Sequence, residues 1–284
     1  MPPGPVNWLY GPARTSSYGY RFTMQNDPLT LELLGPVARM TLNRPKAMNA
    51  LNLATLAAFE RLLPDLATRD ETRVLVITGS GAAFCAGADL KEVTDGLRNA
   101  PGEQDFLDRA RTLFERLAAF PKPVIAALNG VTMAGGLELA MCADLIVAAE
   151  TAKIGDAHAN FGVYPGAGGA AVLPRLVPLN TALYLLFTGK TLSAREMHAL
   201  GLVCEVHPAE TLADATLALA QQIATKSPVA LRRMKEVARA SADKTRADAL
   251  LHEQVMLRAH LRSHDFQEGL RAFAEKRAPS FIGR

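Results

Sequence analysis

The stretch TMAGGLELAMC at residues 132–142 places two glycines, Gly135 and Gly136, directly before a glutamate in an otherwise apolar segment. Glycine inside a helix costs roughly 0.5–1 kcal/mol relative to alanine, so the pair is expected at a helix start, where it leaves backbone N–H groups bare. The glutamate, Glu138, has leucines on both sides, and a carboxylate in such a setting is costly unless it is paired or functional. The stretch therefore predicts a reactive site at the start of a buried helix.

A second turn of the same kind, AGAD at 86–89, also follows an expected strand and opens an expected helix. Free N–H groups at helix starts carry the positive end of the helix dipole, so two such turns that face each other can hold a developing oxyanion. The alternative is that both are tight strand-to-helix turns whose small residues serve only packing. Spacing alone does not separate the two interpretations.

Apolar runs and turn residues divide the chain into elements typical of an α/β protein. The runs lack polar alternation, which indicates a sheet buried on both faces, and helical segments separate them. Strands are expected at 29–34, 37–43, 74–78, 124–128 and about 144–149, and helices at about 52–67 and 103–119. From residue 169 onward the pattern is almost wholly helical. We therefore expect a loosely ordered N-terminal tail at 1–28, a core at 29–205 and a C-terminal helical region at 206–284.

Composition excludes several classes of protein. With 284 residues, 49% of them hydrophobic, the chain can bury a large core. Its 31 basic and 28 acidic residues nearly balance, and no dense Lys/Arg run with interleaved aromatic residues is present, so no nucleic-acid partner is expected. The three cysteines are far apart and form no C-x-x-C pair, which predicts neither disulfides nor a zinc site and favours a cytoplasmic location. No uncharged apolar run reaches the roughly 18 residues of a membrane span, so no membrane association is expected.

Other patterns give weaker indications of function. A G-x-G-x-x-A match at 166–171 follows a Tyr-Pro pair rather than a strand, so a dinucleotide site is not expected there. His260 and His264 are four residues apart on an expected helix, but they lack the intervening glutamate of H-E-x-x-H, which favours a solvated helical face over a metal site. Neither a G-x-S-x-G elbow nor a Walker motif occurs.

Five segments follow one another along the chain as LNRPKAMNAL (42–51), FCAGADLKE (84–92), NGVTMAGGLELAMCADLIVA (129–148), GVYPGAGGAAVLPRLVP (162–178) and AFAEKRAPSF (272–281). In this order they resemble the successive signatures of the crotonase (enoyl-CoA hydratase/isomerase) superfamily. The resemblance implies a crotonase-like ββα spiral core with a C-terminal helical trimerisation region, assembled as a homotrimer or a dimer of trimers. It also implies an acyl-CoA thioester substrate and no separate cofactor, since coenzyme A is part of the substrate.

The resemblance also implies roles for individual residues. The backbone N–H groups of Ala88 and Gly135 correspond to the oxyanion hole that binds the thioester carbonyl and stabilises an enolate. Glu138 matches the first of the two catalytic glutamates of family hydratases. The stretches that line bound coenzyme A correspond to Lys46, Ala47, Met48, Ala86, Asp89 and Leu90. Taken by itself, Lys46 is better explained as a surface lysine after a proline.

The sequence departs from the family pattern at His158, which stands where hydratases have their second glutamate. A Glu/His pair combines an anionic base with a group whose unperturbed pKa is near 6.5. Glu138 could then activate water while His158 holds that water or protonates the α-carbon. Asp156 is a further candidate acid, and a structural hydrogen bond is the alternative role for both Asp156 and His158.

This departure leaves the reaction open. Hydration of a 2-enoyl-CoA is the first choice. The alternatives are another reaction of the same superfamily, such as double-bond isomerisation or thioester hydrolysis, and acyl-CoA binding without catalysis. If His158 acts as a neutral imidazole, kcat is expected to fall on acidification through an apparent pKa within a unit or two of 6.5.

Overall fold

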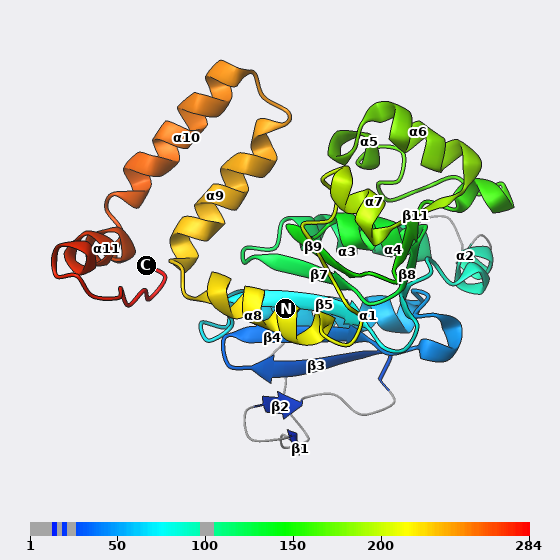
Figure 1. Cartoon of the computed structure of the whole chain (residues 1–284), viewed down its shortest axis with the longest axis horizontal. Helices are drawn as coiled ribbons and strands as arrows, with labels where there is room; N and C mark the ends of the chain where they lie inside the picture. Colours follow the sequence, from blue (N-terminus) through cyan, green and yellow to red (C-terminus); the bar gives the residue numbers. More distant parts are fainter. Residues whose placement is uncertain (1–12, 16–18, 22–26, 97–104) are drawn as a thin grey trace.

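The larger of two sheets forms the centre of the protein, whose computed structural model describes residues 13–15, 19–21, 27–96 and 105–284 (Figure 1). Within these residues the sheet has eight strands in the order β1-β2-β3-β4-β5-β7-β9-β12. Neighbours from β1 to β4 pair antiparallel, and neighbours from β4 to β12 pair parallel. The strands are β1 (Ala13–Thr15), β2 (Gly19–Arg21), β3 (Leu29–Leu34), β4 (Val37–Leu42), β5 (Val74–Gly79), β7 (Val124–Leu128), β9 (Leu145–Ala149) and β12 (Glu205–His207). The five strands predicted from apolar runs are confirmed as β3, β4, β5, β7 and β9.

A second sheet is built from short strands in the order β11-β10-β8-β6. These are β6 (Ala83–Cys85), β8 (Val131–Met133), β10 (Lys153–Gly155) and β11 (Thr191–Ser193). β6, β8 and β10 each follow closely on a strand of the larger sheet, so the chain winds through both sheets before each helical segment. This arrangement confirms the ββα spiral. The residue pattern gave no sign of the second sheet, because a three-residue strand is too short to show a period.

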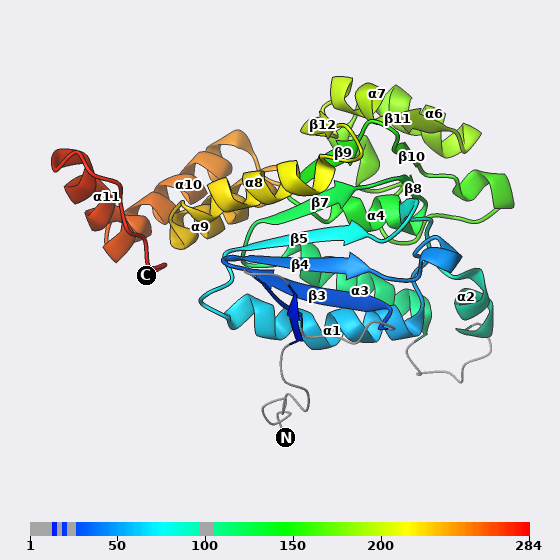
Figure 2. The same cartoon turned by 60° about the horizontal axis from the view of Figure 1, so that its bottom comes forward.

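Helices cover both faces of the larger sheet (Figure 2). α1 (Leu53–Thr68) and α3 (Phe106–Ala118) pack on one face, and α8 (Leu212–Ala224) packs on the other. Along β5, Leu75 and Ile77 belong to the core on the α1 side, whereas Val74 and Val76 belong to the core beneath α8. Side chains that alternate between two apolar cores confirm a sheet buried on both faces.

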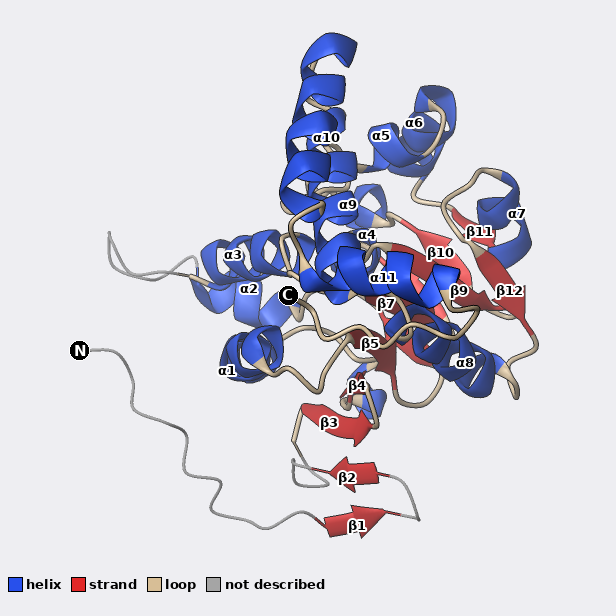
Figure 3. Ribbon diagram, turned by 90° about the vertical axis from the view of Figure 1, so that its left-hand side faces the viewer, coloured by secondary structure: helices blue, strands red, loops and turns tan. Residues whose placement is uncertain are grey.

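The C-terminal arm, defined as α9 (Pro228–Ser241), α10 (Arg246–His260) and α11 (His264–Ala274), extends away from the sheets in Figure 1 and lies on the side that faces the viewer in Figure 3. Its base is attached to the core through Asp144, whose carboxylate lies 2.8 Å from Lys235 Nζ and 2.8 Å from Arg239 Nη2. No helix in the described residues is long and apolar enough to cross a membrane. The remaining helices are η1 (Pro45–Ala47), α2 (Leu90–Gly96), α4 (Gly135–Met141), η2 (His158–Phe161), α5 (Leu173–Leu176), α6 (Leu179–Thr188) and α7 (Ala194–Ala199).

Secondary structure crosses or adjoins both of the domain limits expected from the sequence. β12 continues the larger sheet across the boundary expected after residue 205, and α8 covers that sheet, so the expected C-terminal helical region is divided between the core and the arm. The position of the boundary stays a prediction. Within the expected tail, β1 pairs with β2 and β2 pairs with β3, while 1–12, 16–18 and 22–26 lie outside the described residues.

The prediction that a single helix carries both His260 and His264 is wrong. α10 ends at His260 and α11 begins at His264, because the Ser263 side chain accepts a hydrogen bond from the N–H of Phe266 and caps a new helix. His260 instead lies 3.1 Å from the guanidinium of Arg233. The two histidines therefore do not share one helical face.

Candidate active site

Gly135 and Gly136 allow the start of α4 to contact the backbone of β6 and of the turn that follows β6. α4 begins at Gly135, directly after Ala134, which adopts a left-handed φ of 50°. A Cβ at Gly136 would lie 2.0 Å from the carbonyl oxygen of Cys85, so no larger residue fits there. A Cβ at Gly135 would lie 3.3 Å from the backbone nitrogen of Ala88. The predicted helix start is confirmed, and close approach of β6 and its following turn explains why it needs glycine.

The peptide of Ala88 is held in place by the residues around it. Leu51 donates its N–H to the carbonyl of Gly87 at 2.8 Å and accepts the N–H of Asp89 at 2.8 Å. Gly87 has a φ of 118°, which favours glycine and turns the chain toward Gly135. The N–H groups of Ala88 and Gly135 donate to no group in the part of the chain that the structure describes. Two unpaired amides on adjoining turns are therefore available to an anion.

Glu138 lies one turn into α4 and is buried. Its Oε1 accepts the N–H of Ala167 at 2.8 Å and the N–H of Gly169 at 2.9 Å. Both bonds fall on one oxygen, so they orient the carboxylate and leave Oε2 for a water or a substrate. The glycine-rich motif at 166–171 thus holds a carboxylate rather than a dinucleotide. Sequence reasoning missed these two donors, although the glycines marked a loop with accessible backbone.

His158 and Asp156 form a close pair at the start of η2. His158 Nδ1 lies 2.8 Å from Asp156 Oδ1, and the His158 backbone N–H donates to the same oxygen at 3.3 Å. The Asp156 side chain is 1% exposed and that of His158 is 12% exposed. Burial lowers the pKa of His158, but the hydrogen bond and negative charge of Asp156, with the charge of Glu138, outweigh it and raise that pKa above its ordinary value. The pair therefore favours an imidazolium.

The segments predicted to line coenzyme A adjoin each other. Ala86 donates its N–H to the carbonyl of Met48 at 3.0 Å, which joins the η1 turn with Lys46 and Ala47 to the segment that continues through Ala88. Asp89 accepts a hydrogen bond from the Arg44 guanidinium at 2.9 Å. The side chains of Lys46, Met48 and Leu90 are exposed, whereas those of Ala86 and Asp89 are half-buried. The structure therefore brings these six residues to one region, and their role stays a prediction.

Sequence reasoning missed Asn49, which fixes this region. It is buried, and its Nδ2 donates to the carbonyls of Ser80 at 2.9 Å and Ala83 at 2.7 Å. Its Oδ1 accepts the Arg44 N–H at 2.9 Å. Its φ of 57° is a left-handed conformation that asparagine tolerates well. An asparagine that ends the Pro-Lys-Ala-Met-Asn turn is therefore the sequence feature that could have indicated this residue.

A cavity of about 360 Å³ lies beside Glu138. Phe114 and Ala118 of α3, Met141 of α4 and the loop at 166–172 supply much of its lining. Cys142 also borders it, but burial raises the pKa of this thiol to about 12, so a thiolate nucleophile is not available at neutral pH. Charged side chains of α3 and α9 also border the cavity, but most of its lining is apolar, so it can hold a hydrocarbon chain next to the buried carboxylate.

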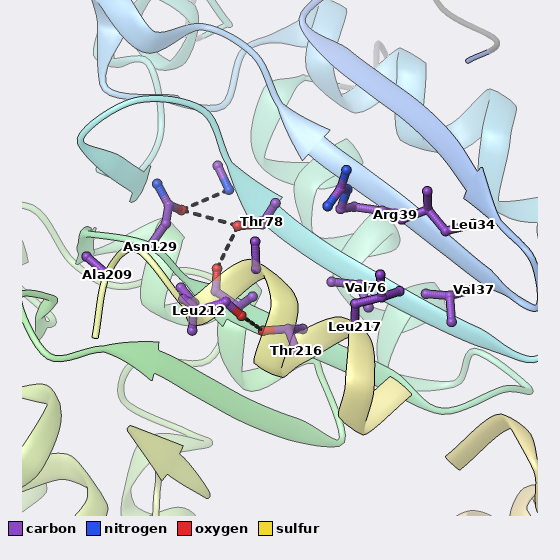
Figure 4. Close-up of a pocket in the computed structure, with 13 residues that line it drawn as sticks. Leu34, Val37, Arg39, Val76, Thr78, Asn129, Ala209, Leu212, Thr216 and Leu217 are labelled. Atoms are coloured by element: carbon purple, nitrogen blue, oxygen red, sulfur yellow. Dashed lines mark hydrogen bonds between the residues drawn. The ribbon is translucent and has the colours of Figure 1, made fainter. Parts of the chain in front are cut away.

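A second cavity lies between the larger sheet and α8 (Figure 4). It measures about 180 Å³, and Arg39, Val76, Thr78 and Leu217 are among its lining residues. Thr78 there donates its hydroxyl to the carbonyl of Ala127 at 2.9 Å. This cavity contains none of the residues predicted for catalysis or for coenzyme A.

The fold is a spiral of paired strands and helices, and its site combines two free amides with a buried glutamate. These features are typical of enzymes that transfer acyl groups or form enolates. Comparison with known proteins narrows this class of enzymes. The family model described as enoyl-CoA hydratase/isomerase matches residues 33–284. The chain belongs to the enoyl-CoA hydratase/isomerase (crotonase) superfamily, whose members bind acyl-CoA, and it is an enzyme of that type in acyl-CoA metabolism.

Curated relatives and solved structures cover nearly the whole chain. A probable enoyl-CoA hydratase of Mycobacterium leprae is 37% identical over 261 residues, which are 92% of this chain and 100% of the relative. The 2,3-dehydroadipyl-CoA hydratase of Escherichia coli is 37% identical over 252 residues, or 87% of this chain and 96% of that relative. The crystal structure of an enoyl-CoA hydratase from Bacillus anthracis has a TM-score of 0.84 and 34% identity, and the match covers 90% of this chain and 100% of that chain.

Proposed function

We propose that the enzyme is an enoyl-CoA hydratase, which adds water across the conjugated double bond of a 2-enoyl-CoA. The observation that carries the proposal is the grouping of Glu138 with His158 at the site of the two free amides. Glu138 follows Gly135 by three residues, and its charge contributes to the raised pKa of His158. This grouping supports the assignment of a base, an acid and an oxyanion site to one buried site.

The proposed reaction begins with the thioester oxygen accepting hydrogen bonds from the N–H groups of Ala88 and Gly135. Glu138 takes a proton from a water whose oxygen bonds to the β-carbon, and the electrons of the double bond move onto the thioester as an enolate. The His158 imidazolium then gives its proton to the α-carbon, and the thioester carbonyl re-forms. Transfer of the proton from Glu138 to His158 restores the starting state.

The remaining parts of the substrate are assigned to neighbouring features. We place the acyl chain in the apolar cavity beside Glu138 and the coenzyme A moiety along Lys46, Ala47, Met48, Ala86, Asp89 and Leu90. Support for the second assignment comes from the hydrogen bond that joins Ala86 to Met48 and from the exposure of Lys46 at the end of this region.

The test is turnover of crotonyl-CoA by the purified enzyme, followed by loss of the conjugated absorbance and by analysis of the product. A 3-hydroxyacyl-CoA product is the expected result. A shifted double bond or a released CoA thiol, found across a panel of thioesters, would instead support isomerisation or hydrolysis. Tight binding of every thioester without turnover would support the non-catalytic alternative and contradict the proposal.

We also propose a homotrimer or a dimer of trimers as the assembled form. The support is the superfamily resemblance together with large apolar side chains that the C-terminal arm leaves exposed. Leu251 is 60% exposed, Val255 is 53% exposed and Phe273 is 85% exposed. Such side chains on an extended arm fit a surface that another copy of the chain covers.

A cytoplasmic location is part of the same proposal. Cys85, Cys142 and Cys204 are all unpaired, which suits a reducing compartment. A human relative that is 38% identical is described as mitochondrial. Fractionation of the producing cells with markers for each compartment tests the proposal, and recovery of the protein in an organelle fraction would contradict it.

A further inference from the structure

Asp156 is a buried carboxylate to which the proposed reaction gives no direct step. Its side chain is 1% exposed, and burial of a negative charge is costly unless a cation or hydrogen bonds compensate it. The only cationic partner it has among the described residues is His158, at 2.8 Å. Its second oxygen, Oδ2, is buried and has no hydrogen-bond partner within the described part of the chain. The imidazole of His158 therefore provides the main compensation for this carboxylate.

Gly169 connects the Asp156–His158 pair to Glu138, the proposed base. Its N–H donates to Glu138 Oε1 at 2.9 Å, and a Cβ built on it would lie 2.4 Å from Asp156 Oδ2. Gly169 therefore adjoins both carboxylates, and its lack of a side chain gives Asp156 the space it occupies. The carboxylates of Glu138 and Asp156 are the acidic groups whose charges act on His158.

We propose that Asp156 is a positioning residue that fixes the imidazole through Nδ1–H and keeps His158 in its cationic form, so that Nε2–H is the proton donor in catalysis. This inference rests on the proposed function. Asp156 itself neither gives nor takes a proton, because its oxygen accepts the Nδ1–H bond throughout the cycle. The role replaces the sequence-based expectation that Asp156 is itself an acid.

Two consequences follow from the geometry. After His158 gives up its Nε2 proton, the hydrogen bond to Asp156 retains the proton on Nδ1, so the neutral ring has one defined tautomer. The bare Nε2 then accepts the next proton from Glu138. Without the Asp156 carboxylate, burial favours the neutral imidazole and only the charge of Glu138 opposes it.

The experiment is an NMR titration of the histidine rings in the whole protein, with His158 assigned by the loss of its signal in His158→Gln. In the wild type we expect His158 to titrate above the ordinary value of about 6.5 and its neutral ring to carry the proton on Nδ1. In Asp156→Asn, which keeps the shape of the side chain, we expect the titration to move down by about one unit or more. The alkaline limb of the kcat profile for crotonyl-CoA should also move to lower pH in Asp156→Asn. In Asp156→Glu both the titration and this limb should lie between those of the wild type and of Asp156→Asn.

Glu205→Gln is the matched control, because Glu205 also precedes a histidine by two residues and bonds to it, His207, at 2.9 Å. It should leave both the His158 titration and the kcat profile unchanged. The inference is overturned if the neutral wild-type ring carries its proton on Nε2, if wild-type His158 titrates at or below about 6.5, or if folded Asp156→Asn leaves the His158 titration unmoved. The wild-type measurements decide the matter even if that variant does not fold. Absence of crotonyl-CoA hydration would refute the proposed function, whereas the titrations test this inference separately.

Discussion

Replacing Gly135 by alanine tests why helix α4 begins with glycine. The new Cβ would lie 3.3 Å from the backbone nitrogen of Ala88, in the space where an oxyanion would approach that amide. Gly135 is not in the left-handed region, and the contact requires a shift of only a few tenths of an ångström, so we expect stability to change by less than about 1 kcal/mol. Loss of one oxyanion donor reduces kcat by about 10²–10³, which corresponds to about 2.7–4 kcal/mol of transition-state stabilisation.

The assay combines crotonyl-CoA kinetics with thermal unfolding, and Gly136→Ala is the control. In that variant the Cβ would lie 2.0 Å from the carbonyl oxygen of Cys85, so the backbone has to move and stability should fall by about 1–3 kcal/mol or more. The reasoning is refuted if Gly135→Ala keeps wild-type kcat. It is also refuted if Gly136→Ala is as stable as the wild type.

Three further predictions concern the acid, the base and the assembly. Glu138→Gln should lower kcat by about 10²–10⁴ while calorimetry shows CoA-thioester affinity within a few-fold of wild type, and wild-type turnover would remove Glu138 from the mechanism. Because Asp156 raises the pKa of His158, an imidazolium acid should lose activity as pH rises through that pKa, which is opposite to the acid-side loss expected for a neutral imidazole. His158→Glu should keep crotonyl-CoA hydration without this alkaline loss, and an unchanged pH 5–9 profile would make His158 structural. Light scattering should show a trimer or hexamer that Leu251→Glu with Val255→Glu dissociates, and a wild-type monomer of 30.4 kDa would contradict the assembly.

The sequence patterns predicted the elements whose apolar residues repeat over enough length. β5 was recognisable because Val74 to Ile77 are apolar without alternation, and both of its faces are covered. The second sheet was not recognisable from residue pattern, because β6, β8 and β10 have three residues each and owe their pairing to partners far along the chain. The break between α10 and α11 depended on a single cap, Ser263, inside a stretch that otherwise looked helical.

The candidate site was predictable where its residues are neighbours in sequence. Gly135 and Glu138 lie on one helical turn, so their proximity follows from local structure. The donors that orient Glu138 come from a loop 29 and 31 residues further on, and no local pattern specifies such a contact. Asp156 and His158 were both recognised as candidates, but the hydrogen bond between their side chains depends on the turn that joins them.

The most direct test of the account is the product of crotonyl-CoA turnover in deuterated water. Addition of water by Glu138 and His158 predicts a 3-hydroxybutyryl-CoA that carries a hydroxyl group at the β-carbon and one deuterium at the α-carbon. Mass spectrometry and NMR of the product identify both positions. A deuterated thioester without a β-hydroxyl group, or free CoA thiol formed without that product, would contradict hydration as the reaction of this enzyme.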